Sequence, residues 1–233
     1  MKRLFPLSLI ALILATLVFI LPATTHAQSA GLVSSVLNKM ERNRQSLKSL
    51  RAGISMEKYN AQLRDAELYD GIVAYLPGAG RDVSVRIEWR SPQHEILAVS
   101  NGSYTLFRPR LKMAYRGKSN NPKVNKNTGN LMEMLYMSRQ QLEAKFHPVQ
   151  DVREETLWGG VSTIHLTLVP KGNANFKYAE IWVDGAGMPI QTKIVEKNDD
   201  STTMRLSNLQ KNVPISSGEF SLKLDSDIKV VKS

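Results

Sequence analysis

The chain contains no cysteine among its 233 residues. This absence excludes disulfide bonds, thiolate metal sites, cysteine nucleophiles and a lipid anchor attached through an N-terminal cysteine. Aromatic residues make up only 7% of the chain, but 42% hydrophobic and 22% charged residues are typical of a globular protein. Packing of apolar side chains must therefore supply the stability of the fold.

Residue patterns of catalysis are also scarce. Three of the four histidines, His94, His147 and His165, are far apart and lack the spacing of metal ligands. No Gly-x-Ser-x-Gly turn surrounds a serine, and the adjacent carboxylates at positions 154–155 and 199–200 cannot form a converging acid and base pair. No glycine-rich loop precedes a helix to hold a nucleotide phosphate. The sequence therefore predicts no enzyme, no metal site and no cofactor.

The only long apolar run lies at the N-terminus. Lys2 and Arg3 precede the apolar residues 4–21, and small residues at Thr25 and Ala27 complete the pattern of a secretory signal. We expect a signal peptide over residues 1–27 and a single mature domain over residues 28–233. An uncleaved membrane anchor is the alternative, because a run of 18 apolar residues is at the lower limit for spanning a bilayer.

The charge of the chain is strongly positive, at +10, and loss of Lys2 and Arg3 with the signal leaves +8. An exported protein seldom meets nucleic acid, so an anionic membrane surface or an acidic protein is the expected partner. Residues 108–126 hold seven cations and no acid. Within them we predict Arg110, Lys112 and Arg116 as docking residues; the alternative is a solvated loop that protects a sheet edge.

Apolar periodicity predicts one helix followed by many strands. Residues 32–50, after a plausible N-cap at Ser29, place apolar side chains at three- and four-residue spacing. From Gly53 onward the period is two, and the residue pair at 101–102 is a strong hairpin signal. Residues 131–146 predict one or two short helices, with Ser138 and Gln141 as a capping box.

These elements predict a fold that is mainly β with α-helices. We expect an incomplete antiparallel β-barrel of about 10–11 strands, with an N-terminal helix and a helical lid. The interior of such a barrel must be filled by side chains, helices or a ligand, and the Met-rich insert is suited to irregular apolar ligands, although core packing is the alternative. The predicted lining residues are Val83, Val85, Ile87, Trp89, Leu97, Val99, Leu131, Met134 and Leu135.

Two blocks of the sequence resemble the family of periplasmic outer-membrane lipoprotein carriers, LolA. The first comprises RIEWRSP (residues 86–92) and LAVSNGSYTLFRP (97–109); the second comprises LTLVPK (166–171), AEIWVDGAGMP (179–189) and TMRLSN (203–208), followed by Phe220. The resemblance covers most of the chain after the signal. Its specificity lies in the order and spacing of the pieces, behind a signal without a lipobox cysteine.

The resemblance implies a periplasmic carrier that holds the acyl chains of lipoproteins or lipids and transfers them from the inner to the outer membrane. It implies an inner-membrane lipoprotein-releasing ABC transporter and an outer-membrane receptor as partners, and we expect a monomer. It also implies Arg81 as a latch between lid and barrel, with Asp82 and Ile87 standing where the family usually has a proline and an aromatic residue. The alternatives are a periplasmic regulatory protein that senses lipoprotein or lipid, and a structural envelope protein.

Overall fold

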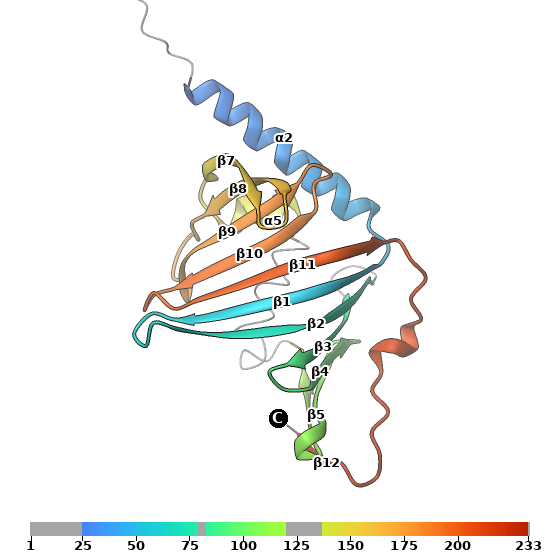
Figure 1. Cartoon of the computed structure of the whole chain (residues 1–233). Helices are drawn as coiled ribbons and strands as arrows, with labels where there is room; N and C mark the ends of the chain where they lie inside the picture. Colours follow the sequence, from blue (N-terminus) through green and yellow to red (C-terminus); the bar gives the residue numbers. More distant parts are fainter. Residues whose placement is uncertain (1–24, 79–82, 120–136, 233) are drawn as a thin grey trace, which may run out of the picture.

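The structure, a computed structural model, describes residues 25–78, 83–119 and 137–232. These residues form one large curved sheet accompanied by helices (Figure 1). The helices are α2 (Thr25–Ser46), α5 (Arg139–Lys145) and the 3-10 turns η1 (Pro109–Leu111) and η3 (Ser217–Phe220). The strands are β1 (Leu50–Asn60), β2 (Asp65–Pro77), β3 (Val83–Ser91), β4 (Glu95–Ser100), β5 (Ser103–Arg108), β6 (Met113–Lys118), β7 (Gln150–Leu157), β8 (Val161–Leu168), β9 (Phe176–Asp184), β10 (Pro189–Glu196), β11 (Ser201–Lys211) and β12 (Lys229–Lys232).

All twelve strands belong to a single sheet that does not close. Their order is β12-β6-β5-β4-β3-β2-β1-β11-β10-β9-β8-β7, so β12 and β7 are the two edges. Neighbouring strands are antiparallel throughout except for β12, which runs parallel to β6. The predicted fold class, an incomplete antiparallel barrel with helices, is confirmed.

The described residues form twelve strands, compared with the predicted number of about 10–11. The sequence pattern missed β7, because its residues QDVREETL are mostly polar and show no alternation of apolar side chains. It also missed β12, whose residues KVVK are too few to show a period. Both strands lie at an edge and pair with only one neighbour, so an apolar alternation was not required of them.

The first helix ends earlier than predicted. The periodicity extends to Leu50, but α2 ends at Ser46 and Leu50 is the first residue of β1. The backbone N–H of Lys48 donates to Asn212 Oδ1 (2.7 Å), and the Ser49 hydroxyl donates to the Val213 carbonyl (2.5 Å). These tertiary bonds take the chain into the sheet, against the local helical pattern. At the other end α2 begins at Thr25, so Ser29 lies inside the helix and not at its N-cap.

Two local predictions are confirmed in atomic detail. Asn101 and Gly102 both have positive φ (49° and 68°) and close the two-residue hairpin between Ser100 and Ser103, as the right-handed twist of paired strands favours. At α5, the Ser138 side chain accepts from the Gln141 backbone N–H (3.2 Å), and Gln141 Oε1 accepts from the Ser138 N–H (2.9 Å).

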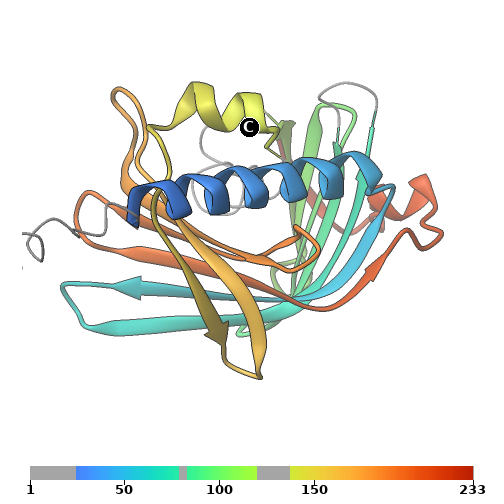
Figure 2. The same cartoon turned by 90° about the horizontal axis from the view of Figure 1, so that it is seen from above.

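Helix α2 lies across the concave side of the sheet, with α5 beside it (Figures 1 and 2). It contributes Val36, Leu37 and Met40, each at most 6% exposed, to a single apolar core shared with β1–β3 and β8–β11. Burial of three such side chains stabilises this arrangement by about 1.5–3 kcal/mol each. The helix is therefore part of the core as well as its cover.

The chain after β11 crosses the convex side of the sheet. The Phe220 side chain of η3 is buried there, next to β3 and β4, and Glu219 forms an ion pair with Arg51 (2.6 Å). The opposite face of β4 from the concave core thus has its own buried residues, Ile96 and Ala98. This C-terminal segment then reaches β12 beside β6 (Figure 1).

Candidate functional site

The strand registers place the predicted lining residues of β3 and β4 on one face. Val85 pairs with Val99 and Ile87 pairs with Leu97, and side chains of directly opposed residues lie on the same side of a sheet. Val85, Ile87 and Trp89 are buried, at 6%, 0% and 5% exposure. The half-buried Val83 and Val99 pack against the same core, and Leu97 is half-buried. These six residues form one continuous apolar surface on the concave side.

The remaining predicted lining residues lie outside the described part of the chain. This holds for Leu131, Met134 and Leu135, and also for Arg81, the predicted latch. The nearest described residue of the Met-rich insert is Met137, which is 8% exposed and belongs to the same core.

A groove of about 580 Å³ opens where α2, α5 and the start of β7 meet. Its volume is within the range of ligand pockets in proteins, about 300–1,000 Å³. Its apolar side chains are Val33, Leu37, Leu142, Phe146, Pro148, Val149 and Val152, and its charged and polar ones are Ser34, Arg139, Glu143, His147, Asp151 and Lys171. None of the predicted lining residues that the structure describes belongs to this groove. It joins the core instead through Leu37, Leu142 and Phe146, which are buried at 5%, 4% and 4% exposure.

Sequence reasoning missed the groove, although one signal could have found it. The capping box at Ser138 fixes the start of a helix in which Leu142 is buried, and the buried Phe146 follows four residues later as the C-cap. A seven-residue helix with one apolar face needs a surface to pack on. The sequence does not say which surface, because α2 and β7 are brought to it only by the tertiary fold.

Polar contacts fasten α5 at both ends. At its N-terminus, Glu41 Oε2 accepts from the Arg139 backbone N–H (3.1 Å), and the Arg139 guanidinium donates to Asn38 Oδ1 (2.6 Å). At its C-terminus, the Lys171 ammonium donates to the Glu143 carbonyl (2.7 Å). We call the contacts of Arg139 with Glu41 and Asn38 the α2–α5 clasp.

The Glu41 carboxylate is the charged centre of the α2–α5 clasp. The hydrogen bond from the Arg44 side chain, opposed by partial burial and assisted by the Arg139 backbone N–H and Gln45, lowers the pKa of Glu41 from 4.5 to about 2. As the pH falls through 4.5, Glu41 in the unfolded chain takes up a proton, whereas Glu41 in the folded protein stays ionised.

A tight turn also fixes α2 to the sheet. In the turn between β9 and β10, Asp184 Oδ1 accepts from the backbone N–H groups of Ala186 (2.9 Å) and Met188 (2.8 Å). Gly187 has φ of 87°, and a Cβ at this position would lie 2.3 Å from the Lys39 carbonyl oxygen. Only glycine allows this approach. Gly187, in the turn of residues 184–189, therefore allows the close contact between the β9–β10 hairpin and α2.

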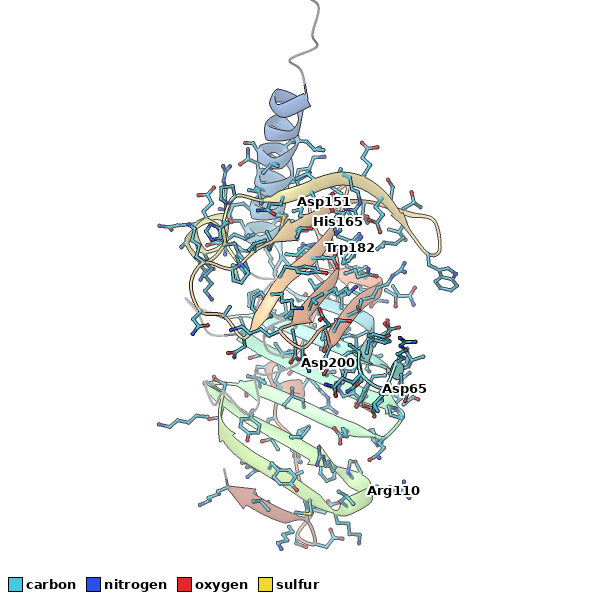
Figure 3. The ribbon with its side chains drawn as sticks, turned by 90° about the vertical axis from the view of Figure 1, so that its left-hand side faces the viewer. Asp65, Arg110, Asp151, His165, Trp182 and Asp200 are labelled. Carbon is cyan, nitrogen blue, oxygen red and sulfur yellow. The ribbon has the colours of Figure 1, made fainter. Side chains whose placement is uncertain are left out.

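The three predicted docking cations do not form one cluster. Arg110 lies exposed on η1, at the end of the sheet remote from His165 (Figure 3). Lys112 pairs with Asp227 of the C-terminal segment (2.8 Å). Arg116 is exposed on β6, where its register partners are Thr105 and Lys232. They share one end of the sheet but have different surroundings.

Beyond α2, the histidines of the described chain have two kinds of environment. His94 and His147 are exposed. His165 is fully buried, with Nε2 at 3.2 Å from Glu180 Oε1 and Nδ1 at 3.3 Å from the Asp151 carbonyl oxygen. Its ring lies 4.8 Å from that of Trp182 (Figure 3). The residues that the structure describes contain no group of three or more His, Cys, Asp or Glu side chains able to hold a metal ion.

Neither helix of the described chain combines the length and apolar character needed to span a membrane.

Comparisons with known proteins identify one family, through a family model, and one fold, through solved structures. The family model for the outer membrane lipoprotein carrier protein LolA matches residues 80–223. An uncharacterized conserved protein from Thermus thermophilus is 11% identical, with a TM-score of 0.54 over 86% of this chain and 98% of that one. MucB in the MucA/MucB complex of Pseudomonas aeruginosa has a TM-score of 0.51 at 12% identity, over 85% of this chain and 63% of that one. No curated protein sequence matches the chain.

Proposed function

Since the chain belongs to the family of the outer membrane lipoprotein carrier protein LolA, we propose that it shelters the acyl chains of lipoproteins or lipids in its apolar concave side and transfers them from the inner to the outer membrane. The observation that carries the proposal is the groove of about 580 Å³ between α2, α5 and β7, which opens onto the apolar core of a sheet that does not close. We assign it a carrier role and no catalysis.

The energetics of acyl burial suit such a groove. Each sheltered methylene contributes about 0.8 kcal/mol, so a chain of about a dozen methylenes gains on the order of 10 kcal/mol when fully covered. A carrier must release its cargo, and complete enclosure would hold it too tightly. A groove with apolar side chains from three elements and a charged rim covers a chain only in part.

We place the acyl chains along the concave face, from the groove toward Val85, Ile87 and Trp89. These residues and the groove belong to one connected apolar core, so an acyl chain that enters beside α5 would extend toward β3 by displacing packed apolar side chains. In this proposal Leu131, Met134 and Leu135 complete the lining and Arg81 latches the lid. An Arg81→Leu variant should alter the release of an acyl probe more than its binding.

A fluorescent fatty-acyl probe tests the proposal directly. We expect saturable binding by the intact mature protein, and loss of binding when Phe146 or Leu142 in the groove is replaced by aspartate. A matched control is Ala144→Asp, an exposed position on the same helix. Mass spectrometry of the protein purified from the periplasm should show bound lipid or lipoprotein. Absence of both probe binding and co-purified lipid would favour a structural envelope protein.

We further propose the cellular setting that this role requires. Residues 1–27 act as the signal peptide, and residues 28–233 work in the periplasm as a monomeric domain. An inner-membrane lipoprotein-releasing ABC transporter loads the carrier, and an outer-membrane receptor unloads it. Arg110, Lys112 and Arg116 assist docking, and exposed charges of this kind act mainly on the encounter rate. Charge reversal at Arg110 should therefore slow delivery at low salt and have little effect at high salt.

A second candidate function is supported by the structural similarity to MucB, whose structure was solved as a complex with MucA. A periplasmic regulator would bind lipoprotein or lipid as a signal and change its affinity for a protein partner. This chain spans 63% of that MucB chain, and at 12% identity the fold alone is shared. The two functions separate in a transfer assay, because a carrier delivers a bound acyl probe to acceptor vesicles and a sensor retains it.

A further inference from the structure

A second groove, of about 520 Å³, lies under the C-terminal segment at the other end of the sheet from α5. The floor of this groove consists of two rows of residues that are paired across β5, β6 and β12. Thr105 pairs with Arg116, which pairs with Lys232, and Ser103 pairs with Lys118. Directly paired residues share a face of the sheet, so the three cations of β6 and β12 lie on the convex side together. Residues 220–222 of the C-terminal segment form the opposite wall.

The charge of this groove is of one sign. Arg116, Lys118 and Lys232 line it, and no Asp or Glu does. Within the described chain none of these three cations forms an ion pair, whereas nearby cations do. Arg108 pairs with Glu95 (2.8 Å) and Lys112 pairs with Asp227 (2.8 Å). The fold thus neutralises two neighbouring cations and leaves the three in the groove available to an external anion.

The neutral groups of the groove suit an anion as well. Ser100, Ser103, Thr105 and Ser221 bring four hydroxyl groups to its lining. Hydroxyls donate to oxyanions, and a guanidinium binds phosphate with two parallel hydrogen bonds. A carboxylate has two oxygens and one charge, so it would leave part of this donor set unused. A phosphate monoester carries about −1.5 to −2 charge and three terminal oxygens, which matches three cations and several hydroxyls better.

We propose that the groove formed by Arg116, Lys118 and Lys232 under the C-terminal segment binds a phosphate group. The group is a phosphate monoester, either in the headgroup of an anionic phospholipid or in a soluble phosphate compound. The site uses none of the residues that we assign to acyl binding, and it stands on the opposite face of the sheet. Its failure would therefore leave the carrier proposal intact, and the converse also holds.

The test measures binding of two probes to the mature protein by titration. One probe is inorganic phosphate, and the other is a vesicle of phosphatidylcholine with phosphatidic acid, whose phosphate is a monoester, compared with phosphatidylcholine alone. The site variant replaces Arg116, Lys118 and Lys232 by glutamine. The matched control replaces Arg90, Lys223 and Lys229 by glutamine. These exposed cations lie outside the groove, and their replacement removes the same total charge.

We expect the site variant to weaken binding of at least one probe about tenfold or more, equal to about 1.4 kcal/mol, while the control stays close to the parent. Inorganic phosphate binding would identify a soluble ligand, and binding only to phosphatidic acid vesicles would identify the membrane headgroup. Equal losses in the site variant and the control would attribute binding to net charge and overturn the proposal. Binding of neither probe by the parent protein, or binding of an acidic peptide only, would overturn it as well. Unchanged thermal unfolding of both variants excludes a folding defect.

Discussion

Replacement of Gly187 by alanine tests whether the β9–β10 turn holds α2 on the sheet. An added Cβ would lie 2.3 Å from the Lys39 carbonyl oxygen and 2.8 Å from the Met40 nitrogen, both backbone atoms of α2. An ordinary contact needs about 1 Å more, so turn and helix must separate by about that distance. The residue also has φ of 87°, which an L side chain adopts at an expense of about 1–2 kcal/mol.

The expected loss of stability follows from the packing of α2. Val36, Leu37 and Met40 are buried beneath the helix, and full burial contributes about 1.5–3 kcal/mol for each. A gap of about 0.5–1 Å forfeits a quarter to a half of the contact energy. The separation alone should therefore destabilise the fold by about 1–4 kcal/mol, in addition to the backbone strain.

The matched control is Gly172→Ala. Gly172 has a similar φ of 73°, but a Cβ there would meet no atom within 4 Å. Denaturant unfolding should show the control to be destabilised by about 1–2 kcal/mol and Gly187→Ala by about 2–6 kcal/mol. Equal losses in the two variants would refute the reasoning, because they would show that the hairpin does not position the helix.

Three further predictions concern other parts of the chain. Val85→Asp should abolish binding of a fluorescent acyl probe, since an unpaired charge on the buried face costs several kcal/mol. The control Ser84→Asp, on the opposite face of β3, should bind the probe as the parent does. Normal folding and probe binding by Val85→Asp would place the cavity elsewhere. Because the folded-state pKa of Glu41 is about 2 against 4.5, its stabilising effect is present above pH 4.5 and is lost as the pH falls toward 2, so unfolding of Glu41→Gln should depend less on pH in this window; identical profiles would show that the hydrogen bonds from Arg44, Arg139 and Gln45 to Glu41 do not stabilise the fold. N-terminal sequencing of the periplasmic protein should begin at Gln28, and a membrane-retained chain that begins at Met1 would contradict the carrier role.

Sequence periodicity was sufficient for the interior of the fold. The alternation of Val83, Val85, Ile87 and Trp89 predicted which face of β3 is buried, and the hairpin at Asn101 fixed the register of the next strands. These features are encoded within a few consecutive residues. The predicted end of α2 was wrong because the true end depends on contacts with Asn212 and Val213, which are more than 160 residues away.

The residues of the candidate sites were harder to predict from the sequence for a related reason. The groove beside α5 draws its walls from residues 33–37, 139–152 and 171, and no local pattern joins these segments. The sequence indicated a basic stretch over residues 108–126, but the structure gives its cations different partners. Lys112 is neutralised by Asp227, whereas Arg116 faces Lys232 across an edge pairing that the sequence did not predict.

The two strands that the sequence missed are the two edges of the sheet, and this coincidence has a physical cause. An open sheet exposes unpaired backbone groups at each edge, and an apolar edge would invite pairing with another chain. Here four of the eight residues of β7 are charged, and β12 begins and ends with lysine. The same polarity that protects these edges removes the alternation by which strands are recognised. It also gathers charged side chains where the two grooves open, because each groove lies next to one edge, the first at β7 and the second at β12. The open edges therefore account both for the difficulty of prediction and for the position of the two grooves described above.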